Sequence, residues 1–124
     1  MSDQNLTITT ERHGDTAVLI LSGRIDVHAA GRMREACRQA VAEGAADLVL
    51  DLSAVPFVSS TGLGSFLVLH QEQEQRGRRV VFAGLQPTPR HVLEVLNLAP
   101  YLELADDVPA ALALLGAPAP VPAG

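Results

Sequence analysis

Three consecutive hydroxyl residues, Ser59, Ser60 and Thr61, stand where their side chains could take part in chemistry. A strand-like apolar run at residues 47–52 precedes them, and a helical pattern follows. The first turn of a helix has backbone N–H groups without intrahelical partners and a partial positive charge, which together suit a phosphate. The position therefore predicts an anion site or a phosphorylation switch, although helix capping by serine is the commoner explanation from spacing alone.

Two glycines follow these hydroxyls and suggest that another group approaches the backbone closely. Gly62 and Gly64 fall inside the first helical turns, where each costs about 1 kcal/mol relative to alanine. A second polar segment, residues 23–26, follows the second expected strand and precedes the first expected helix. Seen alone, it is a turn with Asp26 near a helix N-terminus.

The periodicity of apolar residues predicts the elements that position these groups. Residues 6–10 and 17–21 read as an antiparallel hairpin, and residues 47–52 and 79–83 as buried strands. A helix is expected over residues 29–42, with one stripe of apolar side chains facing the core. That stripe consists of Met33, Ala36, Cys37, Ala40 and Val41. A second helix begins after the hydroxyl residues and stops before Gly77.

The C-terminal part of the chain predicts two further helices and a short strand. Thr88 is expected to cap a helix that begins at Pro89 and turns Val92, Val95 and Leu96 inward. A strand over residues 102–104 then leads to Asp106 and Asp107, whose carboxylates can cap the last helix. The inward side chains expected there are Val108, Ala111, Leu112 and Leu115.

This order of elements predicts one α/β domain over residues 1–116, with a mixed central sheet packed with about four helices. The sheet would join an N-terminal hairpin to parallel strands. Few aromatic rings are available, so the core is expected to contain Phe57, Phe66, Phe82 and Tyr101 among many aliphatic side chains. The Pro- and Ala-rich residues 117–124 are expected to form a flexible tail.

Composition and charge limit the kinds of molecule that this protein could bind. The 124-residue chain has a formal net charge of -5 and no long basic run, which argues against nucleic-acid binding. Its apolar runs are too short to span a membrane, its N-terminus lacks a signal-peptide pattern, and its one cysteine, Cys37, excludes an internal disulfide. We expect a cytoplasmic protein without direct membrane contact. The four histidines show no ligand spacing, so neither a metal nor a cofactor is expected.

Catalysis by one of the hydroxyl residues is a further possibility. Ser59 or Ser60 could act as a nucleophile only beside a base and an oxyanion site. The sequence has neither a Gly-x-Ser-x-Gly elbow nor a Gly-x-x-x-x-Gly-Lys phosphate loop. The chain is therefore predicted not to be an enzyme.

Residues 23–26 (Gly-Arg-Ile-Asp) and 51–64 (Asp-Leu-Ser-Ala-Val-Pro-Phe-Val-Ser-Ser-Thr-Gly-Leu-Gly) together resemble the anti-sigma factor antagonists of the STAS domain family. The resemblance covers residues 6–115 in element order. It implies a bacterial partner-switching protein that binds an anti-sigma factor, itself a serine kinase, and so releases a sigma factor. Phosphorylation would end that binding, and the acceptor implied here is Ser60.

The other residues of this segment take supporting roles in the same hypothesis. Thr61, Ser59, Gly62 and Asp26 would shape the site around the acceptor. A partner would pack over Val58, Leu63 and the outer face of the helix at Gly64. A phosphate adds about -1.5 to -2 charges, which a partner without a cation could not cover.

An alternative stays open beside this hypothesis. Family members that are kinase substrates usually carry Asp immediately before the acceptor, whereas this chain has Ser59. That difference favours a STAS scaffold or sensor that is never phosphorylated, as a subunit of a stress-signalling or lipid-transport assembly.

Overall fold

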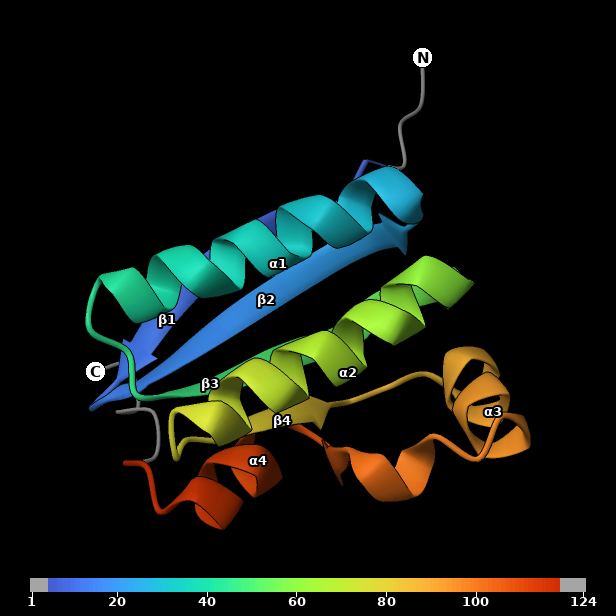
Figure 1. Cartoon of the computed structure of the whole chain (residues 1–124). Helices are drawn as coiled ribbons and strands as arrows, with labels where there is room; N and C mark the ends of the chain where they lie inside the picture. Colours follow the sequence, from blue (N-terminus) through green and yellow to red (C-terminus); the bar gives the residue numbers. More distant parts are fainter. Residues whose placement is uncertain (1–4, 119–124) are drawn as a thin grey trace, which may run out of the picture.

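The computed structural model describes residues 5–118 and contains one mixed sheet with four α-helices (Figure 1). In chain order the elements are β1 (Thr7–His13), β2 (Thr16–Ile25), α1 (Val27–Ala42), β3 (Asp47–Val58), α2 (Ser60–Gln75), β4 (Val80–Ala83), α3 (Pro87–Val95), a 3-10 turn (Ala99–Tyr101), β5 (Glu103–Ala105) and α4 (Val108–Leu115). The sheet order is β1-β2-β3-β4-β5, and only β1 is antiparallel to its neighbour. The predicted fold class and element order are confirmed.

Within residues 5–118, no helix combines the length and the apolar character that crossing a membrane requires.

Helices cover the sheet on both faces. Figure 1 shows α1 and α2 lying side by side across one face, where they bury the larger core with alternate residues of the strands. Helix α4 covers part of the other face, and its Ala111 and Leu112 pack against Val18, Val49 and Val81. The central strands β2, β3 and β4 thus divide their side chains between two apolar layers, which is why they read as continuous apolar runs in the sequence.

The first helix follows its predicted pattern. Met33, Cys37 and Ala40 are buried, and Ala36 and Val41 pack at the edge of the core. The helix begins at Val27, two residues earlier than predicted, because Asp26 already caps it. In α4, Asp107 accepts a hydrogen bond from the Ala110 N–H at 2.9 Å, as its position predicted.

Strands β2 and β3 continue well beyond their predicted ends. Residues 23–25, expected in a turn, are the last residues of β2, and β3 runs on to Val58. The register between the two strands shifts between Ile20 and Ser22 and again between Ser22 and Arg24. These irregularities break the alternation that a sequence pattern detects, so the extension was missed.

The third helix differs most from its prediction. It begins at Pro87 with Gln86 as N-cap, so Thr88 is not the cap. Its buried side chains are Pro89 and Leu93, whereas Val92, Val95 and Leu96, expected inside, are exposed. These side chains are exposed because α3 lies at the edge of the core (Figure 1), where only a narrow face of the helix packs against other side chains.

The aromatic rings divide between core and surface. Phe66 and Phe82 are fully buried, with their ring centroids 4.5 Å apart. Phe57 and Tyr101, also expected in the core, are exposed. Most of the predicted tail lies outside the described residues. Of its first residues, Ala117 packs against the α4 side of the sheet, and its N–H donates to the Leu112 carbonyl.

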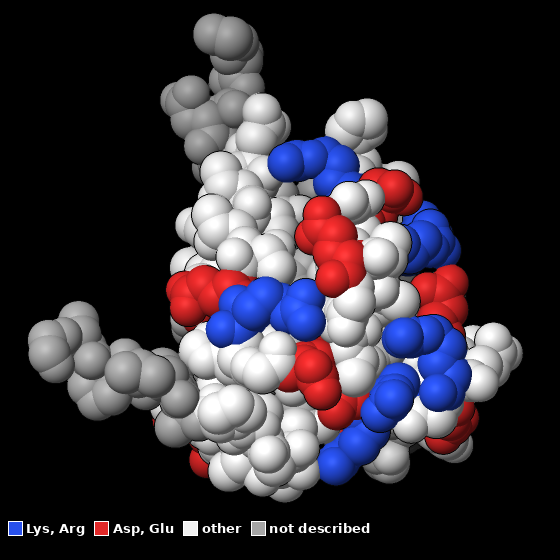
Figure 2. Space-filling model, turned by 90° about the vertical axis from the view of Figure 1, so that its left-hand side faces the viewer, with Lys and Arg blue, Asp and Glu red and all other residues white. Residues whose placement is uncertain are grey.

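Hydrogen bonds of polar side chains join the elements at the end of the sheet where the parallel strands begin. The Gln73 side chain, 3% exposed, donates to the carbonyls of Ala46 and Arg79 at 3.0 Å each, which joins α2 to the starts of β3 and β4. Arg79 also pairs with both carboxylate oxygens of Glu103 on β5. Figure 2 shows arginine and acidic side chains interspersed on the described part of one face.

The Arg79–Glu103 pair predicts a pH-dependent contribution to stability. The hydrogen bonds and charge of Arg79 lower the pKa of Glu103 in the folded protein. The pair therefore stabilises fully above the ordinary glutamate pKa of about 4.3, and this contribution is lost as the pH falls through the lowered value. We expect Glu103→Gln to reduce the free energy of unfolding by up to about 1 kcal/mol at pH 7, because the pair is partly exposed.

Urea unfolding of both proteins across pH measures this effect. The difference between them should shrink as the pH falls below about 4. A constant difference down to strongly acidic pH would show that the charge of Glu103 is not its cause.

Candidate functional site

The carboxyl ends of β2 and β3 bring the two predicted segments together. Ile25 pairs with Val58 in the parallel ladder, and the Ser59 N–H donates to the Ile25 carbonyl at 2.8 Å. Helix α1 begins directly after β2, and α2 begins directly after β3. Asp26 and Ser59 therefore lie at neighbouring helix starts on one edge of the sheet, the edge where parallel α/β sheets usually carry their functional groups.

Both residues cap the helices that follow them. The Asp26 carboxylate accepts a hydrogen bond from the Ala29 N–H at 2.8 Å. The Ser59 hydroxyl accepts one from the Gly62 N–H at 3.1 Å. Capping satisfies a backbone donor that a helix start leaves unpaired. The capping explanation is thus correct for Ser59, and it leaves the two following hydroxyls for another role.

Ser60 and Thr61 are the first two residues of α2, and both are exposed. Neither hydroxyl hydrogen-bonds to another side chain or carbonyl among residues 5–118; the Thr61 carbonyl accepts from the Ser65 hydroxyl at 3.0 Å. Thr61 therefore does not cap the helix, because Ser59 does. A phosphate on the Ser60 hydroxyl would stand at the positive end of a 16-residue helix.

The two glycines of the segment have different environments. A Cβ atom at Gly62 would lie 2.6 Å from Val58 Cγ1 and 2.9 Å from Ile25 Cγ2, so α2 packs against the strand ends at a distance that only glycine permits. The close approach expected at this position is made by the protein itself. At Gly64 a Cβ would meet no atom within 4 Å, and the backbone is exposed. Gly64 is the glycine that leaves space for something outside the chain.

Two of the residues expected to contact a partner are buried. Val58 is 8% exposed and Leu63 is 1% exposed, and both belong to the core beneath the helix start. Their side chains pack in the core beneath the turn, so the surface open to a partner is formed by the exposed residues around them. Leu63 is buried because it comes one turn into a helix whose inner face rests on the sheet.

The structure adds two exposed residues that the sequence did not assign to the site. Phe57 and Arg24 are paired across β3 and β2, and the Arg24 guanidinium lies 4.1 Å from the centre of the Phe57 ring. Phe57 immediately precedes Val58 at the strand end, and its ring is exposed. Aromatic and arginine side chains are the types most enriched among the residues that dominate protein interfaces. The sequence pattern did not mark Phe57, because burial along residues 55–58 does not alternate: Val55 and Val58 are buried, whereas Pro56 and Phe57 are both exposed.

The cap at Ser59 predicts a stability effect. Ser59→Ala removes the acceptor for the Gly62 N–H and should lower the free energy of unfolding by about 1 kcal/mol, whereas Ser59→Asp keeps an acceptor and should cost little. Chemical denaturation of the three proteins measures this. Equal stability of the alanine variant and the wild type would contradict the capping role.

The described residues contain no group of three or more His, Cys, Asp or Glu side chains that could hold a metal ion. The exposed groups at this edge of the sheet are the hydroxyls of Ser60 and Thr61, the backbone of Gly64, and the side chains of Phe57 and Arg24. Such a surface suits docking and covalent modification.

Comparison with known proteins places this chain in one family. Residues 7–111 match the STAS domain, and the chain belongs to the STAS domain family. It is 38% identical over 78 residues to the anti-sigma-F factor antagonist RsfB of Mycobacterium tuberculosis, which covers 63% of this chain. The aligned part spans 62% of the length of that relative.

Solved structures agree with this assignment. An anti-sigma factor antagonist from Mycobacterium paratuberculosis has a TM-score of 0.78 at 28% identity, covering 93% of this chain and 97% of that one. The antagonist SpoIIAA in its unphosphorylated form has a TM-score of 0.73 at 26% identity, covering 89% of this chain and 97% of that one. Its phosphorylated form from Bacillus has a TM-score of 0.66 at 25% identity, covering 87% and 99%.

Proposed function

We propose that this protein is an anti-sigma factor antagonist that binds an anti-sigma factor in the bacterial cytoplasm and thereby frees a sigma factor. Its similarity to RsfB and to SpoIIAA supports this function. The observation that carries it is the helix start at Ser60, where an exposed hydroxyl stands beside an open glycine at the meeting point of two strand ends. The partner is inferred to be both the anti-sigma factor and the serine kinase.

The docking surface of this proposal has Ser60, Thr61 and Gly64 at its centre. Val68 extends it one helical turn along the exposed side of α2, and Val27 borders it at the start of α1. Both valines are exposed, so a partner could bury apolar area on either side of the acceptor. The small residues at the centre let a partner backbone approach closely.

Phosphorylation of Ser60 would switch this surface off without unfolding the domain. The phosphate would add about -1.5 to -2 charges at the N-terminus of α2, where the helix dipole tolerates them. Under a docked partner the same charge would lose water and need a cation to compensate it. Binding would therefore be lost while the fold is kept.

The serine in place of the family's usual Asp before the acceptor has a structural explanation. Ser59 caps α2 through its hydroxyl, and serine and aspartate are about equally good N-caps. The substitution therefore keeps the helix start in place and removes only a charge. We infer that the acceptor geometry is kept, and that the kinase supplies the electrostatic contribution that Asp makes elsewhere.

A reconstituted release assay tests the proposed function. A candidate ATP-binding anti-sigma factor is first complexed with its sigma factor, and the purified chain is then added without ATP. Size-exclusion chromatography should show free sigma factor and a new complex of the chain with the anti-sigma factor. A sigma complex left intact at excess chain, with each candidate, would refute the proposal and favour the scaffold or sensor alternative.

A further inference from the structure

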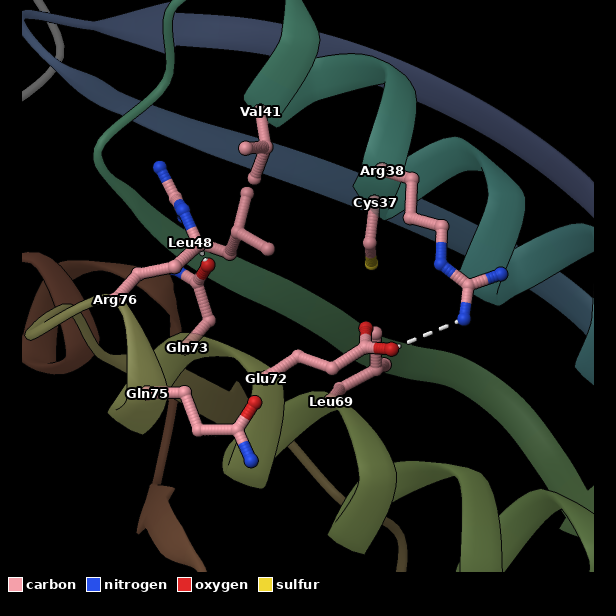
Figure 3. Close-up of a pocket in the computed structure, with 9 residues that line it drawn as sticks. All are labelled: Cys37, Arg38, Val41, Leu48, Leu69, Glu72, Gln73, Gln75 and Arg76. Carbon is pink, nitrogen blue, oxygen red and sulfur yellow. Dashed lines mark hydrogen bonds and ion pairs between the residues drawn. The ribbon is translucent and has the colours of Figure 1, made fainter.

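A pocket of about 330 Å³ lies between the C-terminal halves of α1 and α2, away from the candidate site (Figure 3). Arg38 on α1 and Glu72 on α2 are among the residues that line it. Glu72 comes twelve residues after Ser60 along α2, which places it about 18 Å from the acceptor along the helix axis. The pocket is thus a separate feature of the fold, and the proposed docking surface does not use it.

The inner wall of the pocket is apolar. Val41, Leu48 and Leu69 line it from α1, β3 and α2, and Figure 3 shows the Cys37 sulfur pointing into the space between the helices. Burial raises the pKa of the Cys37 thiol to about 12, so the thiol is neutral at physiological pH. Cys37 therefore contributes to the apolar wall and does not act as a nucleophile there.

The rim of the pocket carries one positive charge that no acid compensates. Arg38 and Glu72 form an ion pair at 3.0 Å and neutralise each other. Arg76, at the other end of the pocket, hydrogen-bonds to the neutral amide oxygen of Gln73 and has no acidic partner among residues 5–118. An apolar wall with a single unpaired guanidinium on the rim complements a molecule that has an apolar body and one negative charge.

We propose that this pocket binds a small amphipathic carboxylate, with its hydrocarbon chain between α1 and α2 and its carboxylate on Arg76. The volume is near the lower end of the range for small-molecule sites, about 300–1,000 Å³, so a compact aliphatic acid fits better than a nucleotide. The two helices that hold it are the two whose N-termini are capped by Asp26 and Ser59.

Titration of the full-length protein with octanoate, followed by amide chemical shifts in NMR spectra, tests the proposal. Shifts should concentrate in residues 37–41 and 69–76. Hexanoate, which is two methylenes shorter, should bind about fifteenfold more weakly, because each buried methylene contributes about a factor of four. Octan-1-ol, which has no charge, should also bind more weakly than octanoate.

Two arginine variants complete the test. Arg76→Gln should weaken octanoate binding by about tenfold or more, as expected for loss of a charged hydrogen bond. Arg78→Gln removes the same charge two residues along the chain, outside the pocket, and should leave the affinity unchanged. Absence of pocket shifts at millimolar octanoate, equal binding of the alcohol, or equal weakening by both variants would overturn the proposal.

Discussion

Ser60→Glu is expected to reduce affinity for the anti-sigma factor at least about 100-fold, whereas Ser60→Ala retains it. Each tenfold loss corresponds to about 1.4 kcal/mol. A carboxylate at this position would be buried under the partner without a compensating cation, and the cost of such burial exceeds the energy of most single contacts. Alanine removes the hydroxyl without adding charge, so the surface stays complementary. Isothermal titration calorimetry with the purified partner measures both affinities.

The stability of the variants separates a docking effect from a folding effect. A glutamate in the first turn of α2 interacts favourably with the helix dipole, so Ser60→Glu should be at least as stable as the wild type. Thr10→Glu introduces the same charge at an exposed position of β1, and it should leave affinity unchanged. Equal loss of binding in Thr10→Glu and Ser60→Glu would mean that net charge, and not the site, governs docking.

Gly62→Ala is expected to lower the free energy of unfolding by about 1–3 kcal/mol. Its Cβ would lie 2.6 Å from Val58 Cγ1 and 2.9 Å from Ile25 Cγ2, and both neighbours are buried core side chains. The helix start would have to move from the strand ends, which would shift the acceptor as well. Thermal or urea unfolding measures the effect.

Gly64→Ala is the matched control for this prediction. The position has the same residue type two places along α2, and an added Cβ would meet nothing within 4 Å. Alanine should therefore stabilise the protein by up to about 1 kcal/mol, through helix propensity alone. If both substitutions destabilised equally, the steric account of Gly62 would be refuted.

Much of the fold could be predicted because the apolar periodicity is regular where elements are covered. The stripe of α1 and the short run of β4 lie under other elements along their whole length. The prediction failed where an element is only partly covered. Helix α3 buries Leu93 and leaves Val92 exposed, and no sequence pattern distinguishes adjacent apolar residues at the edge of a core.

The candidate site was located from sequence, but the roles within it were not fully assigned. Ser60 was named as the acceptor from the resemblance to the STAS antagonists, and the structure places it exposed at the start of α2. The burial of Val58 and the exposure of Phe57 depend on the extension of β3 through a register shift that the sequence does not signal. Leu63 is buried because it lies on the face of α2 that rests on the sheet. A close approach to the backbone was expected at Gly62, and the groups that make it are Val58 and Ile25 at the strand ends.

Phosphorylation by the anti-sigma factor tests the central claim most directly. The complex of the chain with its partner is incubated with Mg-ATP, and the chain is then examined by intact-mass spectrometry and peptide mapping. We expect the added mass of one phosphoryl group, located on Ser60, together with dissociation of the complex and no added mass in Ser60→Ala. An unmodified chain, or a complex that persists after Ser60 is phosphorylated, would contradict the switch.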